Sequence, residues 1–491
     1  MFNKITPESA GVSSACIKEY LDYLNRRGIA MHGVLFMKGE DIFAECYWTP
    51  FDKDFCHRMY SQTKSYVAIA IGLLQDEGKL NITDKIMDYF PEKIHTDLHE
   101  YLKEQTIEDM LLMCTAGETP YWFNVPDEDR TELYLNKHSN ARPSRTVWQY
   151  DSAGSQVMCN LVEKLSGKTM LEYMKEKLFD EMGTFKTAQL LKVRNGDSWG
   201  DSALVCTQRD MASFARLLLN GGSWHGKRLV SEDYVKRATS PIVSCSESGF
   251  YDCFHAHGYG YQIWHSEMGS FAFVGMGGQL TIAVPSLDAI FVCTGDNQGY
   301  PSAYNLIIDG LFDYVFSKMG EPLPENATEV ASLEKFCATQ SLVSLKSTVK
   351  TDLSKTIDGV TYYAPTNPTG ITELTFKFEG DKGVLCYKNG QGYKELPFGI
   401  DHNEFSLFPE LGYSNEFGGL KTTDGFKYKC AVSGAFVEEK KLCLKVQIID
   451  RYFGNFFAVF AFKDDYCAVK MTKTAEDFLQ TYQGNFVAKR K

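Results

Sequence analysis

The chain has 491 residues, of which 44% are hydrophobic and 23% are charged, and its formal net charge is −12. This length leaves room for two or three domains with large cores, and the composition is that of an ordinary globular protein. The excess of acidic residues argues against nucleic acid or an anionic membrane surface as a partner, because both attract basic patches.

Several sequence features bear on location and cofactors. Residues 1–9 lack the charged segment and apolar run of a secretory signal, and no run of about 18 apolar residues could span a membrane. The 14 cysteines are scattered and form no Cys-x-x-Cys pair. We therefore expect a cytoplasmic protein with free, mostly buried thiols. We expect no metal or other cofactor, because zinc spacing is absent and His95 and His99 have no evident third ligand nearby.

The first 320 residues show strand patterns at both ends and helical patterns between them. An amphipathic helix within 11–30 precedes two strands, 33–38 and 41–48, that a hairpin turn joins. Helical patterns then prevail to about residue 220. Further strands are expected at 260–265, 270–274, 280–284 and 289–294, followed by a helix at 303–318. This order predicts an α+β domain: an antiparallel sheet flanked by helices, with an inserted helical lobe.

The rest of the chain has a different character. The segment Glu321-Pro322-Leu323-Pro324-Glu325-Asn326 indicates a linker, which we place at 321–334. Short strand-like pieces separated by turns recur from residue 359 to residue 472. They predict an all-β barrel or sandwich of about 150 residues. The predicted domains are therefore 1–320 and 335–491.

Three Ser-x-x-Lys matches begin at Ser61, Ser332 and Ser347. Such a match alone is usually a helix N-cap serine followed by a surface lysine. Ser61 differs because it follows a strand-like segment and opens an apolar helix over 65–74. Positions i and i+3 share a helix face, so the Lys64 amine can reach the Ser61 hydroxyl and help to remove its proton. The pair predicts Ser-Lys acyl-transfer chemistry.

Two further segments could complete such a site. Tyr150 lies in a polar turn before a predicted helix at 156–165 and is our candidate proton relay, although most tyrosines are packed with a satisfied hydroxyl. The glycines within 275–279, between two strands, suggest that another group approaches the backbone closely. That group would be a substrate at an oxyanion hole, and a β-bulge or hairpin turn is an equal alternative.

The three pieces occur in the order and approximate spacing of the serine β-lactamase and penicillin-binding-protein superfamily. The chain most resembles the class C β-lactamase-like esterases and amidases, over about residues 5–318. The C-terminal part resembles the lipocalin-like domain that some members carry. Similar stretches are 57–61, 111–117, 206–212 and 258–262.

The resemblance implies a β-lactamase-like fold and a role for each position. Ser61 would be the acylated nucleophile, and Lys64 would help to activate it. Tyr150 would pass the proton between Ser61 and the leaving group. The backbone N–H groups of Ser61 and Gln279 would hold the oxyanion. Ser152 stands where the family's Tyr-x-Asn motif has asparagine, and would orient the substrate carbonyl.

Two departures from the family pattern bear on the substrate. Many β-lactamases carry a Lys-Thr-Gly triad on the strand that edges the site, and here the aligned residues are Met276, Gly277 and Gly278, without a cation. The resemblance assigns that lysine to the carboxylate of penicillins. Its loss, with the loss of the asparagine at Ser152, favours a small-molecule ester or amide without that carboxylate.

We therefore expect a serine hydrolase that forms an acyl-enzyme on Ser61. Two alternatives stay open: a catalytically silent binding or regulatory protein on the same scaffold, and a weak β-lactamase or D-amino-acid peptidase. Two roles are open for the second domain, capping the cleft and forming a homodimer.

Overall fold

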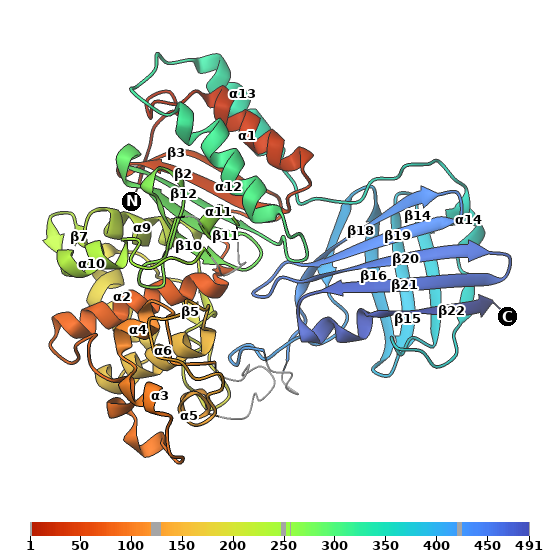
Figure 1. The fold of residues 1–491 in the computed structure, drawn as a ribbon. Coiled ribbons are helices and arrows are strands. Elements are labelled where there is room, and N and C mark those ends of the chain that lie inside the picture. The colour runs from red at the N-terminus through yellow and green to blue at the C-terminus, as the bar shows by residue number, and fades with distance from the viewer. Residues whose placement is uncertain (1, 119–128, 247–251, 256, 420–424, 491) are drawn as a thin grey trace. The chain divides into compact units, whose positions relative to one another are not determined.

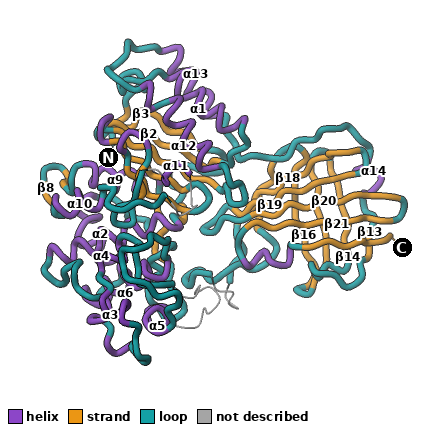
Figure 2. Tube along the Cα trace, in the orientation of Figure 1, coloured by secondary structure: helices purple, strands orange, loops and turns teal. Residues whose placement is uncertain are grey.

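The computed structural model describes residues 2–118, 129–246, 252–255, 257–419 and 425–490. The chain divides into two compact units, Met1–Ser341 and Leu342–Lys491. The first unit mixes helices with a sheet, whereas strands dominate the second (Figure 2). The predicted fold class, an α+β domain followed by an all-β domain, is confirmed.

A seven-stranded sheet forms the frame of the first unit within the described residues, in the order β1-β3-β2-β12-β11-β10-β9. Only β1 and β3 pair in parallel; the other neighbours in this sheet are antiparallel. Because β2 pairs with β12, strands from the two ends of the unit lie side by side, as predicted. The bounds are β1 (Asn3–Lys4), β2 (Met31–Lys38), β3 (Asp41–Tyr47), β9 (Trp264–His265), β10 (Phe271–Gly275), β11 (Gln279–Val284) and β12 (Ala289–Gly295).

Helices cover both faces of this sheet (Figure 1). On one face, Tyr20 of α1 packs against Phe36 and Phe291, with ring centroids 6.3 and 6.1 Å apart, and donates to the Ile307 carbonyl of α12 at 2.9 Å. On the other face, α9 packs against β2, β11 and β12. The sheet is therefore buried on both sides. The bounds are α1 (Ser14–Arg26), α9 (Gln208–Leu219), α11 (Asp252–His255), α12 (Ala303–Tyr314) and α13 (Ala327–Ala338).

The predicted helical lobe lies beyond α9 and is built around α2 and α6. Tyr66 of α2 stacks on Phe214 of α9, with centroids 4.0 Å apart, and this contact connects the lobe to the sheet layer. The α6 helix is capped by Asp151, which accepts the Gly154 N–H at 3.0 Å, and it ends at Gly167 in the left-handed conformation. The lobe helices are α2 (Thr63–Asp76), α3 (Glu100–Glu104), α4 (Ile107–Leu111), α5 (Arg130–Asn136), α6 (Ser152–Ser166), α7 (Met170–Met174), α8 (Asp180–Met182) and α10 (Glu232–Ala238).

Short strands complete the first unit. A three-stranded sheet has the order β4-β6-β5, and β7 pairs with β8. Their bounds are β4 (His57–Arg58), β5 (Gln189–Leu190), β6 (Leu204–Cys206), β7 (Ser223–Trp224) and β8 (Lys227–Arg228).

The second unit is a closed barrel. Within the described residues, nine strands form the ring β16-β15-β14-β13-β22-β21-β20-β19-β18, which closes because β16 also pairs with β18; β17 adds to β18. Buried aromatic rings fill it, as where Phe376 meets Phe460 edge-on at 4.9 Å. The bounds are β13 (Thr361–Tyr363), β14 (Glu373–Glu379), β15 (Lys382–Asn389), β16 (Gly392–Ile400), β17 (Asn403–Leu407), β18 (Lys429–Glu438), β19 (Lys441–Ile448), β20 (Asn455–Lys463), β21 (Tyr466–Thr474) and β22 (Gly484–Arg490). The described part of this unit also contains the helix α14 (Leu353–Ile357) and a 3₁₀ helix, η9 (Asp477–Tyr482).

The division between the units lies later in the chain than the predicted linker. The α13 helix packs on α1, where Lys18 Nζ donates to Ser332 Oγ at 2.9 Å. Residues 321–334, which we expected to be a linker, therefore belong to the first unit. The new boundary falls at Ser341 and Leu342.

All 14 cysteines lie in described residues as free thiols, and most are buried. In the described part of the chain, none of the helices has the length and apolar character required to cross a bilayer.

Candidate active site

Ser61 and Lys64 lie where a short strand leads into α2. Ser61 is the middle residue of a 3₁₀ turn, η1 (Tyr60–Gln62), rather than part of the α-helix that we expected, and Lys64 is in the first turn of α2. The Lys64 Nζ donates a hydrogen bond to Ser61 Oγ at 3.0 Å. The contact that the sequence spacing predicted is therefore present.

The Lys64 amine is held in a buried environment. Lys64 is only 1% exposed, and its Nζ also donates to the Asp201 carbonyl at 2.7 Å. Burial lowers the pKa of Lys64 to about 8, although the nearby charges of Asp201 and Asp151 favour the protonated form. A substantial fraction of this amine is therefore neutral near pH 8.

Tyr150 meets the same serine from the other side of the site. Burial is the larger effect on its phenol and raises the pKa of that group, whereas an interaction with the Ser61 side chain lowers the same pKa. The Lys64 Nζ lies 5.1 Å from the centroid of the Tyr150 ring, which stacks on Trp264 at 6.0 Å. The structure thus brings the hydroxyl, the amine and the phenol together.

The turn that carries Tyr150 is fixed at both ends. The Gln149 N–H donates to the Met113 carbonyl at 2.9 Å. On the other side, the Asp151 side chain caps α6, as described above. Ser152 is the first residue of that helix and is partly buried. It is one residue removed from the cap, so the family's asparagine position lies at the N-terminus of α6.

The hairpin between β10 and β11 lies against η1. Gly275 and Gln279 pair at its base. A Cβ atom at Gly275 would lie 2.1 Å from the Met59 carbonyl oxygen, so only glycine permits this approach. Thr281 Oγ1 also donates to Gln62 Oε1 at 3.0 Å. The segment is thus a hairpin turn, and it holds the Gln279 backbone near the nucleophile turn.

Other polar groups of this hairpin form hydrogen bonds within the first unit. The buried Gln279 side chain donates to the carbonyls of Gly295 at 2.6 Å and Met276 at 3.1 Å. The Gly278 N–H donates to the Tyr304 hydroxyl at 3.4 Å, so it is already engaged inside the unit. Met276 is 43% exposed at the tip of the turn. The hairpin therefore offers an uncharged thioether side chain where the family triad has its lysine.

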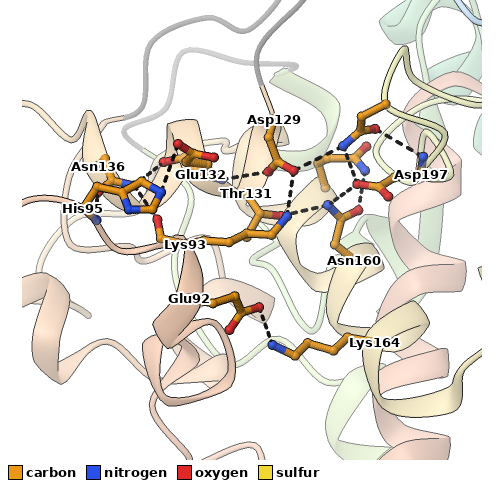
Figure 3. Close-up of polar contacts among 12 residues, drawn as sticks. Glu92, Lys93, His95, Asp129, Thr131, Glu132, Asn136, Asn160, Lys164 and Asp197 are labelled. Carbon is orange, nitrogen blue, oxygen red and sulfur yellow. Dashed lines mark hydrogen bonds and ion pairs between the residues drawn. The ribbon is translucent and has the colours of Figure 1, made fainter.

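A polar network in the lobe anchors the loop that leads to Asp201 (Figure 3). Asn160 of α6 donates to Asp197 Oδ2 at 3.0 Å and to Thr131 Oγ1 at 2.8 Å. In the same loop, the Ser198 carbonyl accepts a hydrogen bond from a side-chain amide of α6 at 2.7 Å. The backbone acceptor of Lys64 is thereby tied to the helix that follows Tyr150.

Sequence reasoning missed Asp201 and Asp151. Asp201 accepts the Lys64 hydrogen bond through its backbone carbonyl, a group that every residue carries, so no side-chain pattern could have identified this contact. Asp151 lies between two residues that we did single out, Tyr150 and Ser152, and an aspartate directly before a predicted helix is a usable N-cap signal.

Comparisons with known proteins agree with this geometry. The Beta-lactamase family profile matches residues 14–302, more than half of the chain. The 6-aminohexanoate-dimer hydrolase of Paenarthrobacter ureafaciens is 25% identical over 280 residues, which cover 52% of this chain and 70% of that protein.

Solved structures share the fold of the first unit. A candidate 6-aminohexanoate-dimer hydrolase from Bacillus anthracis has a TM-score of 0.51 at 20% identity and covers 66% of this chain and 89% of its own. A β-lactamase/D-alanine carboxypeptidase from Yersinia pestis, complexed with citrate, has a TM-score of 0.51 at 15% identity and covers 62% and 98%. The chain therefore belongs to the Beta-lactamase family and is a serine hydrolase.

Proposed function

We propose that this enzyme hydrolyses an ester or amide bond of a small molecule through an acyl-enzyme on Ser61. One observation carries the proposal: the Lys64 amine donates a hydrogen bond to the Ser61 hydroxyl, and the Tyr150 phenol is close enough to interact with the Ser61 side chain. A serine becomes a nucleophile when neighbouring groups can take its proton and deliver it to the leaving group.

The proposed reaction has two halves. Neutral Lys64 accepts the Ser61 proton as Oγ attacks the substrate carbonyl, and the backbone N–H groups of Ser61 and Gln279 hold the oxyanion. Tyr150 then relays the proton to the departing alcohol or amine, and the carbonyl re-forms as an ester on Ser61. Water, deprotonated by the same pair, attacks that ester, and the proton returns to Ser61 Oγ as the acid leaves.

The residues at the edge of the site suggest the class of substrate. Met276 offers no cation to a substrate carboxylate, and Ser152 offers a hydroxyl instead of an amide. Both fit the class C-like esterase and amidase branch better than a penicillin-cleaving enzyme. An amide substrate is also consistent with the name of the Paenarthrobacter ureafaciens relative, a dimer hydrolase.

Mass spectrometry after treatment with a fluorophosphonate probe tests the proposal. We expect one adduct, mapped to Ser61 and absent in Ser61→Ala. Ser332→Ala is the matched control, because Ser332 begins a second Ser-x-x-Lys match, on α13. Absence of label, while a control hydrolase is labelled, would overturn the proposal in favour of a catalytically silent scaffold. Efficient nitrocefin turnover that Ser61→Ala abolishes would favour the β-lactamase alternative.

A further inference from the structure

The residue before the proposed nucleophile has an unusual backbone conformation. Tyr60 has φ of 48°, in the left-handed region that bulky side chains rarely adopt. Such conformations persist only where the surrounding structure enforces them, and they cluster at functional sites. Because Tyr60 adjoins Ser61, its conformation sets the direction of the Ser61 N–H and side chain.

The backbone on both sides of Tyr60 is pinned to β6. The Met59 N–H donates to the Leu204 carbonyl at 2.7 Å. The Thr63 hydroxyl donates to the Tyr60 carbonyl at 2.7 Å and accepts the Leu204 N–H at 3.1 Å. These bonds fix the backbone on either side of Tyr60 and Ser61, so the backbone of Tyr60 must connect two fixed points.

The side chain of Tyr60 is held by a buried arginine. The Arg58 guanidinium carbon lies 4.3 Å from the centroid of the Tyr60 ring and 4.5 Å from the Trp199 ring. Arg58 is buried, so these cation–π contacts are poorly screened by water. The guanidinium thus links the ring of the strained residue to Trp199.

The same arginine reaches the loop that binds Lys64. Arg58 Nε donates to the Ser202 carbonyl at 2.9 Å, and Nη2 lies 3.5 Å from Ser202 Oγ. The preceding residue, Asp201, supplies the carbonyl that accepts from Lys64 Nζ. One side chain is therefore connected to the backbone before the nucleophile and to the acceptor of its lysine.

We propose that Arg58 is a positioning residue, which holds Tyr60 in its left-handed conformation and so fixes Ser61 relative to Lys64 and the oxyanion donors. This inference rests on the proposed function and names the device that prepares the site. A planar cation is required, because a lysine ammonium could not stack on the Tyr60 ring while donating sideways to Ser202.

Charge provides a second, separable consequence of Arg58. The charged groups that face Lys64 are the carboxylates of Asp201 and Asp151 and the guanidinium of Arg58, and the Tyr150 ring lies against its amine. The Arg58 charge favours the neutral amine. The acid limb of the pH–rate profile is the range in which the rate rises with pH as Lys64 loses its proton. Arg58→Met should therefore move this limb to higher pH, whereas Arg58→Lys should leave it in place.

The test measures the rate at which a fluorophosphonate labels Ser61 in the full-length chain. Thermal melting checks that each variant is folded. We expect Arg58→Lys and Tyr60→Leu to lower the rate by about 10-fold or more, because small displacements of reacting groups are costly. Tyr60→Phe keeps the ring and should stay within about 2-fold of wild type. The double variant, Arg58→Lys with Tyr60→Leu, should be labelled little more slowly than either single variant, because the two substitutions remove the same contact.

Arg216→Lys is the matched control, because Arg216 is also buried but donates to Asp288, outside the proposed site. It should lower the melting temperature without changing the labelling rate. Wild-type labelling of Arg58→Lys, or equal losses in Tyr60→Phe and Tyr60→Leu, would overturn the inference. A wild-type chain that is not labelled at Ser61 would instead overturn the acyl-enzyme itself.

Discussion

The surroundings of Ser61 and the interior of the barrel differ in the kind of side chain that they bury. Around Ser61 the fold buries several ionisable side chains. In the barrel the buried centre is aromatic, with Phe376, Phe398 and Phe460 fully enclosed. The buried ionisable residues near Ser61 include His57, Arg58, Lys64, Arg130 and Asp201.

This difference separates stability from chemistry. Burying a charge costs free energy unless partners compensate, and part of that cost is expressed as the lowered pKa of Lys64. Burying phenylalanine is favourable and contributes to stability with no reactive consequence. Substitutions in the barrel core should therefore alter folding, whereas substitutions near Ser61 should alter rate.

The largest effect is expected for Phe376→Ala in the barrel. Truncating a fully buried phenylalanine costs about 3–5 kcal/mol of unfolding free energy. All six tryptophans lie before residue 342, so their fluorescence reports the first unit, whereas far-ultraviolet circular dichroism reports both. We expect the part of the dichroism change that comes from the barrel to move to lower urea concentration, and the fluorescence transition to stay in place.

Phe457→Ala is the control for that experiment, because Phe457 lies on β20 but is 36% exposed. It should cost less than about 1 kcal/mol. If Phe376→Ala moved both transitions together, the two units would unfold as one, and the contrast between them would fail.

Lys64→Ala should lower kcat by about 10²-fold or more while the fold is kept, as expected for a general base. Steady-state kinetics on a chromogenic ester, with thermal melting as the check on folding, measure the effect. Lys335→Ala is the matched control, because Lys335 ends the Ser-x-x-Lys match on α13 and is exposed. Unchanged turnover in Lys64→Ala would remove this residue from the mechanism.

Tyr150→Phe should also lower kcat by about 10²-fold, because it deletes the hydroxyl that interacts with Ser61 and that we propose as the proton relay. Tyr234→Phe is a useful comparison. It deletes a buried hydroxyl that donates to the Ala68 carbonyl at 2.6 Å, so it should cost about 1 kcal/mol of stability and leave kcat unchanged. Equal kinetic losses in the two variants would mean that Tyr150 acts only through packing.

Sequence alone could predict the local parts of the site. The Ser61–Lys64 contact follows from spacing within one turn, so no tertiary information was needed. Tyr150 is distant in sequence: its polar turn made it a candidate relay, and the family resemblance supported its place beside Ser61. The Asp201 carbonyl depends on how a loop folds over α2, and tertiary packing decides that.

The barrel was predicted in kind but not in every strand. We did not identify β16, β17 or β22. Of these, β16 contains Gly392, Pro397 and Gly399, residues that are rare in strand interiors. It forms because β15 pairs with it along its length. In the first unit β9 is shorter than the predicted strand 260–265, because Gln262 has φ of 56° and interrupts the extended backbone.

The smallest effect is a shift in pH dependence. If neutral Lys64 is the base, kcat/KM rises with pH through a pKa of about 8. Burial raises the pKa of Asp151 to about 6, so this carboxylate is charged at pH 7 to 8 and favours protonated Lys64. Asp151→Asn keeps an N-cap for α6 but removes the charge, so the acid limb should move to lower pH, by less than about one pH unit.

The direction of that shift identifies the titrating group. Asp210→Asn, which removes a capping carboxylate of α9 that is not among the charges facing Lys64, should leave the limb unchanged. If the limb instead reported ionisation of a carboxylate such as Asp151 itself, Asp151→Asn would abolish it rather than displace it. A limb that stayed in place would mean that the proton controlling the rate is not on Lys64, because removing a nearby negative charge must lower the pKa of an amine.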